Sequence, residues 1–278
     1  MRKLGPFKPG LRQFGVPKGG PFDTWSAQMA CALVCAKPSG TAFELEMATA
    51  TLHLEQNVLV SLVGGGHIAE DGGRPLAPNS CWLIRAGQKL RISYQGQGAR
   101  AYCALTSLAP DAVLQIDQLV SKLSDPPWTF ERKVFRYSPL GQPTLVRGVV
   151  GAESNRVGVR VSAEIVAHDV QIGLSQPIVE GTMQVPPKGG LIVTGPDGPT
   201  IGGYERIGVV IAADFPALGQ LVPGESVEFV PVGQDVAFQA YKEANDRDSR
   251  QCEMVRSLVS DKLQSLGVRL GNIAEDRT

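Results

Sequence analysis

The chain has 278 residues, enough for one large or two medium domains, because typical domains run to about 100–200 residues. Lysine and arginine together number 27, as do aspartate and glutamate, and no stretch concentrates charge of one sign. This balance argues against nucleic acid or an anionic membrane as a partner and favours small molecules or proteins.

Composition also indicates the compartment and the fold class. No apolar run reaches the roughly 18 residues needed to span a bilayer, and the start of the chain lacks an apolar signal core, so we expect a cytoplasmic protein. The five cysteines include no Cys-x-x-Cys pair, which favours reduced thiols. Thirty-two glycines and twenty prolines are typical of many short strands joined by turns.

The first predicted element is a helix near residues 23–35. The Asp23 carboxylate can cap the free N–H groups of its first turn. Trp25, Met29 and Leu33 follow at a spacing of four residues, which places them on one helical face. This pattern predicts a helix with one buried side.

From the helix to residue 108 the pattern is typical of strands. Residues 51–55 and 89–94 alternate polar with apolar side chains, and residues 58–63 form a short apolar run. The regular pattern fades between residues 109 and 132, where proline turns dominate. We therefore expect a first β subdomain over residues 1–108 and a linker over 109–132.

The second half repeats the strand pattern and then turns helical. Its predicted strands lie at residues 133–137, 144–150, 190–194, 208–212 and 226–230. Residues 234–266 contain no proline or glycine, and apolar positions recur there among many charged ones. This pattern predicts a second β subdomain over residues 133–233 and a C-terminal helical tail over 234–278.

Four motifs follow one another along the chain. Residues 15–23 read Gly-Val-Pro-Lys-Gly-Gly-Pro-Phe-Asp, and residues 154–161 read Ser-Asn-Arg-Val-Gly-Val-Arg-Val. Residues 180–189 read Glu-Gly-Thr-Met-Gln-Val-Pro-Pro-Lys-Gly, and residues 197–204 read Asp-Gly-Pro-Thr-Ile-Gly-Gly-Tyr. Together and in this order they resemble the motifs of the allophanate hydrolase subunit 2 family, also called the carboxyltransferase A/B domain.

The resemblance implies a mainly β fold with two cyclophilin-like β-barrel subdomains, to which the sequence adds the C-terminal helix. The family includes the C subunit of 5-oxoprolinase, so the leading hypothesis is a subunit of an ATP-dependent, heteromeric hydrolase that opens a lactam or related amide. Its expected partners are a homologue of allophanate hydrolase subunit 1 or of the 5-oxoprolinase B subunit, and a third subunit. On this hypothesis the chain itself binds no cofactor, and the complex uses ATP.

Two alternatives remain open. Gly198 and Pro199 stand where the family has arginine and glutamine, and residues 105–108 replace a glycine-rich segment. Loss of a guanidinium removes donors suited to carboxylate or phosphate, which favours a non-catalytic, regulatory protein like the family's kinase-inhibitor antagonist. The other alternative is a carboxyltransferase component acting on urea or a related amide, which would need a biotinylated partner.

The family motifs also supply the candidate site residues. Asp197 and Arg156 are the candidate catalytic residues, although a carboxylate in a turn can simply accept backbone hydrogen bonds and a guanidinium can simply brace a carboxylate. Gln184 offers both a donor and an acceptor, which suits amide recognition, although buried glutamines commonly satisfy neighbouring backbone groups. The other candidate substrate-binding residues are Asn155, Thr200, Gly202, Gly203 and Tyr204.

Motifs for metals and nucleotides are missing from the sequence. His53, His67 and His168 have no spacing that would place two imidazoles on one helical face, so we expect no metal site. The sequence also contains no P-loop and no Gly-x-Ser-x-Gly element, which argues against ATP binding by a P-loop and against a hydrolase nucleophile elbow.

Overall fold

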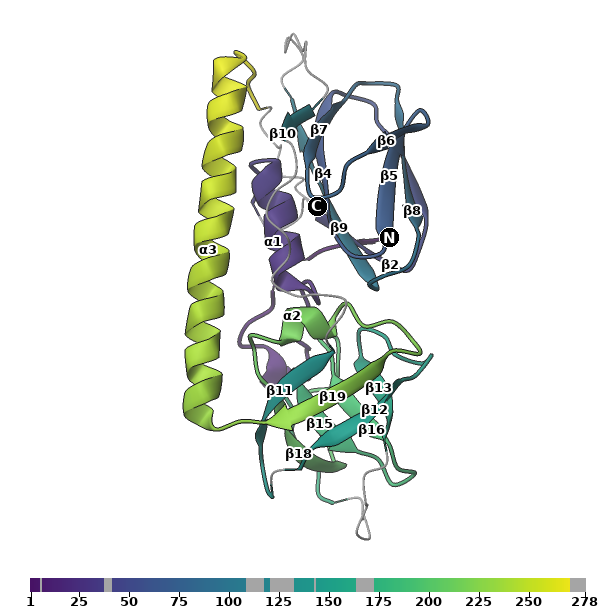
Figure 1. Ribbon diagram of the computed structural model, residues 1–278, viewed down its shortest axis with the longest axis vertical. Coiled ribbons are helices and arrows are strands. Elements are labelled where there is room, and N and C mark those ends of the chain that lie inside the picture. The colour runs from purple at the N-terminus through teal and green to yellow at the C-terminus, as the bar shows by residue number, and fades with distance from the viewer. Residues whose placement is uncertain are drawn as a thin grey trace. The chain divides into compact units, whose positions relative to one another are not determined.

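The fold was analysed in a computed structural model (Figure 1), which describes residues 1–5, 7–37, 42–108, 118–120, 133–142, 144–163 and 173–270. The chain divides into two compact units. The first unit comprises Met1–Gly5, Thr24–Pro127 and Asp248–Thr278. The second unit comprises Pro6–Asp23 and Trp128–Arg247.

These units differ from the predicted ranges because two segments pack with residues that are distant in the sequence. Residues 6–23 group with the second unit, and residues from 248 onward group with the first. Most of the predicted linker at 109–132 lies outside the described residues. Within it, Gln118–Val120 form a short strand, β10, that pairs with β7 (Cys81–Ile84).

The first unit contains a six-stranded sheet, a four-stranded sheet and a helix, α1. The sheets have the strand orders β1-β2-β9-β4-β7-β10 and β3-β8-β5-β6. The remaining bounds are β1 (Arg2–Lys3), α1 (Thr24–Leu33), β2 (Ala42–Glu46), β3 (Ala50–His53), β4 (Val58–Gly64), β5 (His67–Asp71), β6 (Arg74–Leu76), β8 (Lys89–Tyr94) and β9 (Arg100–Ser107). Among the described residues, the first half therefore forms two separate sheets, whereas the resemblance implied a β-barrel.

The position of β4 explains its largely apolar sequence, in which Ser61 is the polar exception. One core cluster joins the two sheets through side chains such as Val60 and Leu90. A second cluster joins the six-stranded sheet to α1 and to the later part of the C-terminal helix through side chains such as Leu59 and Val255. Because β4 contributes to both clusters, it is buried on both faces and lacks the polar–apolar alternation of a strand with one exposed face.

The second unit contains a closed barrel with the strand order β11-β18-β15-β16-β13-β12-β19. A small separate sheet pairs β14 with β17. The bounds are η1 (Arg12–Phe14), β11 (Val134–Pro139), β12 (Val146–Val150), β13 (Gly158–Ala163), β14 (Gln176–Pro177), β15 (Thr182–Val185), β16 (Leu191–Thr194), β17 (Ile201–Gly202), β18 (Glu205–Val210), α2 (Phe215–Leu218) and β19 (Ser226–Pro231). The predicted second β subdomain is thus a seven-stranded barrel.

The barrel core also holds the end of the N-terminal segment. Phe22 is fully buried in this core, and its ring stacks on Phe215 of α2 with centroids 5.0 Å apart. Next to it, the buried Asp23 carboxylate accepts a 2.7 Å hydrogen bond from the Gln220 side chain. The stacked Phe22 ring and the buried hydrogen bond to the Asp23 carboxylate therefore hold the end of the N-terminal segment against the rest of the second unit.

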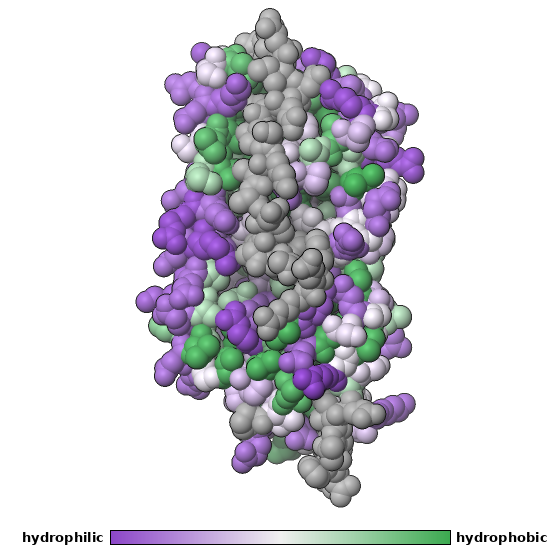
Figure 2. Space-filling view, in the orientation of Figure 1, coloured by the Kyte–Doolittle hydropathy of each residue, from purple (hydrophilic) through white to green (hydrophobic). Residues whose placement is uncertain are grey.

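The last element is the helix α3 (Gln234–Ser265), which contributes residues to both units and matches the predicted helix. Val255, Val259 and Leu263 are its buried residues in the first unit, whereas Phe238 is exposed. Hydrophilic and hydrophobic residues are interspersed on the face of the molecule shown in Figure 2. Among the described helices, none is long and apolar enough to cross a membrane.

His67 in β5 is a buried titratable residue of the first unit. Its ring is buried, and Nδ1 lies 2.8 Å from the Gly65 carbonyl oxygen. Burial lowers the pKa of this imidazole. The folded state therefore holds His67 neutral at a pH where the unfolded chain already binds a proton on it.

We predict that the free energy of unfolding decreases as the pH falls below about 6.5, the ordinary histidine pKa, because the unfolded state then binds more protons. His67→Gln should show a smaller decrease than the wild type when urea denaturation is compared at about pH 7.5 and about pH 5.5. His53→Gln, at an exposed position in β3, is the control and should behave like the wild type. Equal decreases in all three proteins would refute the assignment to His67.

Candidate functional site

The outer face of the barrel carries the candidate site. In the register of β15 and β16, Met183 pairs with Val193 and both point into the barrel core. The next pair, Gln184 and Ile192, therefore points outward, because side chains alternate along strands. Arg160 of β13 also points outward, since its neighbours Val159 and Val161 belong to the core.

A cavity of about 240 Å³ lies against this outer face, and we call it the amide cavity for the Gln184 amide in its wall. The small β14–β17 sheet contributes to its wall through Gly202, and Ile178 follows β14 directly. A Cβ at Gly202 would collide with Ile178 Cδ1 and lie 3.2 Å from Gln184 Oε1, so a larger residue here would have to displace the Ile178 side chain. The lining residues are Val157, Arg160, Ile178, Gln184, Ile192, Thr194, Pro199, Gly202, Gly203 and Tyr204.

Hydrogen bonding determines how the Gln184 amide is oriented. The Thr194 hydroxyl donates to the Thr182 carbonyl oxygen at 3.2 Å, so it must accept from its other neighbour. Gln184 Nε2 donates to that hydroxyl at 2.9 Å. Within the part of the chain that the structure describes, Gln184 Oε1 accepts no hydrogen bond. The cavity therefore contains an amide oxygen that is available to a donor on a ligand.

The rest of the cavity wall is mainly apolar, with polar groups at two positions. Val157, Ile178 and Ile192 supply aliphatic surface. Tyr204 is 39% exposed, and the Arg160 side chain is about half exposed, with its Nε 3.6 Å from Glu153 Oε2. A small, mostly uncharged molecule with an N–H donor fits these surroundings, and Arg160 can reach an attached anion.

The two candidate catalytic residues bind each other. Arg156 Nε donates to Asp197 Oδ2 at 2.8 Å, and Arg156 Nη2 donates to Asp197 Oδ1 at 3.0 Å. The same Nη2 also donates to the Gly20 carbonyl oxygen at 2.6 Å. Neither residue lines the cavity, so the geometry gives them a bracing role, and a catalytic role for them stays a prediction.

The Asp197 turn packs closely on its neighbours. A Cβ at Gly198 would collide with Thr194 Cγ2 and lie 2.8 Å from the Val157 carbonyl oxygen. The arginine that the family carries at this position therefore does not fit in the present conformation. Pro199 lines the cavity instead of the family's glutamine.

The other predicted site residues separate into two groups. Gln184, Gly202, Gly203 and Tyr204 line the cavity, and their role in substrate binding stays a prediction. Asn155 is exposed and accepts a 2.8 Å hydrogen bond from the Val157 amide, and the Thr200 carbonyl oxygen accepts one of 2.9 Å from Ile178 N–H. Asn155 and Thr200 thus shape the loops beside the cavity rather than its wall.

The first-half motif supports the same loops. The Gly19 amide donates to the Pro196 carbonyl oxygen at 3.0 Å, and Lys18 forms a 3.1 Å ion pair with Glu180. Arg12 donates a hydrogen bond to the Ile178 carbonyl oxygen. All these residues belong to the second unit, so the N-terminal segment contacts loops that lie next to the cavity.

Sequence reasoning missed several cavity residues. Arg160 was within the quoted motif at residues 154–161, and its place as the charged residue among alternating valines was a signal that it faces outward. Thr194, Ile178 and Ile192 gave no comparable signal, because hydroxyl and aliphatic side chains are common in any strand. Among the described residues, no three His, Cys, Asp or Glu side chains lie together as a metal site would require.

Comparison with known proteins identifies the family. A protein-family model described as "Carboxyltransferase domain, subdomain A and B" matches residues 14–110 and 148–231. The chain belongs to this family. The matched ranges include the whole of all four motifs, which confirms the resemblance, whereas α3 begins after the last matched residue.

Two relatives extend this finding along most of the chain. The chain is 26% identical to the C subunit of 5-oxoprolinase of Escherichia coli (strain K12) over 277 residues, covering 83% of this chain and 88% of that protein. It is 24% identical to urea amidolyase of Lachancea kluyveri over 336 residues, covering 94% of this chain but 17% of that protein.

Solved structures confirm the mainly β fold. The crystal structure of the protein TTHA0988 has a TM-score of 0.68 at 23% identity, with 83% of this chain and 53% of that chain covered. The Kluyveromyces lactis urea carboxylase has a TM-score of 0.73 at 20% identity, with 90% of this chain and 28% of that chain covered. The chain thus spans about half the length of the first structure and less of the second.

We predict that Asp197→Asn lowers the free energy of unfolding by about 2 kcal/mol, because it removes the negative charge that accepts two hydrogen bonds from the buried Arg156 guanidinium. The loss should be smaller than for a fully buried pair, because the Asp197 side chain is 21% exposed. Urea denaturation measures the change. The matched control is Glu228→Gln in the exposed Arg147–Glu228 pair, where we expect a loss of at most about 1 kcal/mol.

A different result would change the role of the pair. If Asp197→Asn folds with unchanged stability but loses a ligand-dependent effect, the carboxylate serves the chemistry rather than the loop.

Proposed function

We propose that the chain is a subunit of an ATP-dependent, 5-oxoprolinase-type complex and that its cavity binds the cyclic amide substrate. The relatives named as the C subunit of 5-oxoprolinase and as urea amidolyase support a role in an amide-cleaving assembly. The observation that carries the proposal is the Gln184 amide oxygen, which accepts no hydrogen bond from the described residues and faces a mainly apolar cavity.

The contacts of the cavity match the parts of a lactam. A ring N–H can donate to Gln184 Oε1, which is oriented by Thr194, while the ring methylenes pack on Ile178 and Ile192. The volume of about 240 Å³ lies below the range of roughly 300–1,000 Å³ that suits drug-sized ligands. A single small ring is therefore the preferred occupant.

In this proposal the candidate residues have two kinds of role. Gln184, Gly202, Gly203 and Tyr204 bind the substrate. Arg156, Asp197, Asn155 and Thr200 are positioning residues, since they hold the loops that bound the cavity.

The remaining chemistry falls to other subunits. The sequence has no P-loop, so we propose that a homologue of allophanate hydrolase subunit 1 or of the 5-oxoprolinase B subunit, together with a third subunit, brings ATP and activates the amide. This chain holds the ring in a fixed orientation while they act, and it carries no cofactor of its own. Holding two reactants in the correct orientation can by itself account for a large part of the decrease in activation free energy.

One alternative has specific support. A regulatory protein that keeps the fold without the chemistry would explain why Gly198 and Pro199 replace two polar family residues and why Arg156 is already bound to Asp197. A carboxyltransferase component acting on urea is the weaker alternative and rests on the relative named urea amidolyase.

Co-purification separates these functions. The full chain would be tagged in its native host, its partners identified, and 5-oxoproline-dependent ATP hydrolysis assayed on the recovered complex. Partners with activity support the proposal, and the same partners without activity favour the regulatory protein. Recovery of a biotinylated partner with urea-dependent turnover would favour the carboxyltransferase component, and the chain alone should be inactive.

We predict that Gln184→Met weakens lactam binding by about tenfold or more, because a buried hydrogen bond is lost while the side-chain volume is kept. Isothermal titration with 2-pyrrolidinone and 5-oxoproline measures the affinity. Gln239→Met on the exposed surface of α3 is the control and should bind like the wild type. If Gln184→Met binds both lactams with unchanged affinity, the amide cavity is not the lactam-binding site.

A further inference from the structure

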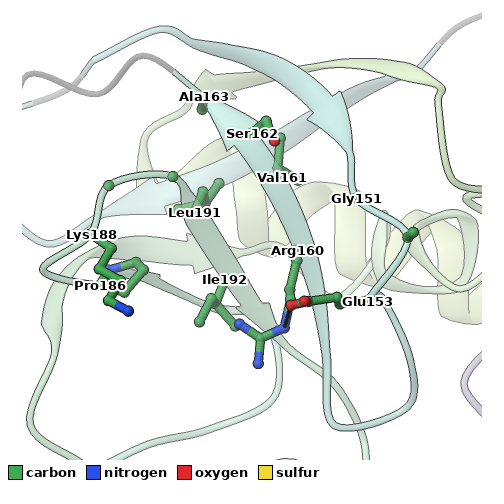
Figure 3. Close-up of a pocket in the computed structure, with 13 residues that line it drawn as sticks. Gly151, Glu153, Arg160, Val161, Ser162, Ala163, Pro186, Lys188, Leu191 and Ile192 are labelled. Atoms are coloured by element: carbon green, nitrogen blue, oxygen red, sulfur yellow. Dashed lines mark ion pairs between the residues drawn. The ribbon is translucent and has the colours of Figure 1, made fainter.

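A second and larger depression lies on the outer face of β13 and β16, and we call it the β13–β16 groove. Its volume is about 700 Å³, against about 240 Å³ for the amide cavity. Figure 3 shows Arg160, Glu153, Ile192 and Lys188 around it, with Lys188 on the loop before β16. The ring contacts proposed above lie in the amide cavity, so they assign no role to this groove.

The groove and the amide cavity share part of their walls. Arg160 and Ile192 line both of them. These two side chains come from paired strands, since Arg160 of β13 is the register partner of Ile192 of β16. A ligand with one end against Gln184 can therefore continue past Arg160 into the groove.

The charges in the groove favour an anion. Arg160 and Lys188 contribute two positive charges, and Glu153 contributes one negative charge. Lys188 is exposed and forms no ion pair with any residue that the structure describes. The side chains that line the groove thus have a net positive charge.

The pair between Arg160 and Glu153 is easily exchanged. Their closest distance is 3.6 Å, from Arg160 Nε to Glu153 Oε2, and the two side chains are 49% and 83% exposed. Exposed ion pairs of this kind contribute little to stability. The guanidinium has five N–H donors in a planar fork, so an incoming carboxylate or phosphate can bind it in place of Glu153.

We propose that the β13–β16 groove is an oxyanion subsite, in which Arg160 and Lys188 bind the carboxylate or phosphate of a ligand whose amide end lies against Gln184. The amide end of this proposal rests on the proposed function, whereas the oxyanion end stands on the groove alone. The ligand class is therefore an amide that carries an anionic group.

Titrations of the full-length protein with four probes, followed by NMR, test the two ends separately. 2-Pyrrolidinone has only the amide, inorganic phosphate and acetate have only an oxyanion, and 5-oxoproline has both. Arginine Nε–H and lysine side-chain signals report on Arg160 and Lys188, and the side-chain amide signal reports on Gln184. We expect 5-oxoproline to bind about tenfold tighter than 2-pyrrolidinone, as one charge-assisted hydrogen bond provides.

Three variants should change oxyanion affinity in different ways: one should lower it, one should raise it and one should leave it unchanged. Arg160→Gln should reduce binding of the oxyanion probes by about tenfold or more. Its effect on 2-pyrrolidinone, which carries no anion, should be several-fold smaller, although Arg160 also lines the amide cavity. Glu153→Gln should increase oxyanion affinity, because it removes the competing carboxylate. Arg147→Gln is the matched control, since Arg147 also pairs with a glutamate on the exposed face of the same barrel, and it should change nothing.

The outcomes distinguish the two proposals. If the oxyanion probes leave Arg160 and Lys188 unaffected and both lactams bind equally well, the oxyanion subsite is overturned while the amide cavity stands. If an oxyanion shifts Arg160 and 2-pyrrolidinone leaves Gln184 unaffected, the subsite stands and the proposed amide function fails. Acetate binding would identify a carboxylate ligand, and binding of phosphate alone would identify a phosphate-bearing one.

Discussion

The Arg156 guanidinium connects three segments of the second unit. It donates to Asp197 through two nitrogen atoms and to the Gly20 carbonyl oxygen through one of them. A buried cation is costly unless it is paired and hydrogen-bonded, so these partners must stay together in the folded protein. The loops that carry them also bound the amide cavity, because Val157 and Pro199 lie close to the pair in sequence and line the cavity. The shape of the candidate site thus depends on this one side chain.

The barrel supplies the rigid part of the site. Its strands bury aliphatic and aromatic side chains on the inside and therefore turn Arg160, Gln184 and Thr194 outward. Groups on strands are held more precisely than groups on loops, which suits a cavity that orients a ligand by one amide oxygen. The β14–β17 sheet then adds Gly202, whose missing side chain leaves the space open.

The departures from the family pattern have a local physical explanation. The turn at Gly198 packs on Thr194 and on the Val157 backbone, so a large side chain at this position would have to displace both. Asp197 nevertheless keeps a guanidinium partner, which comes from Arg156. The more exposed cations of the neighbourhood are found farther along the outer face, where Arg160 faces the β13–β16 groove together with Lys188. Anion recognition in this chain is therefore best sought in that groove.

The sequence by itself determined the features that depend on neighbouring residues. Polar–apolar alternation predicted the strands, a long stretch without proline or glycine predicted α3, and the motifs supplied Gln184 and Tyr204 as candidate site residues. Only the tertiary structure paired Arg156 with Asp197, brought residues 6–23 to the barrel and placed Arg160 between two depressions. Arg156 and Gly20 are 136 positions apart. Contacts over such separations have no local periodicity to reveal them, because they form only when strands from distant parts of the chain close the barrel.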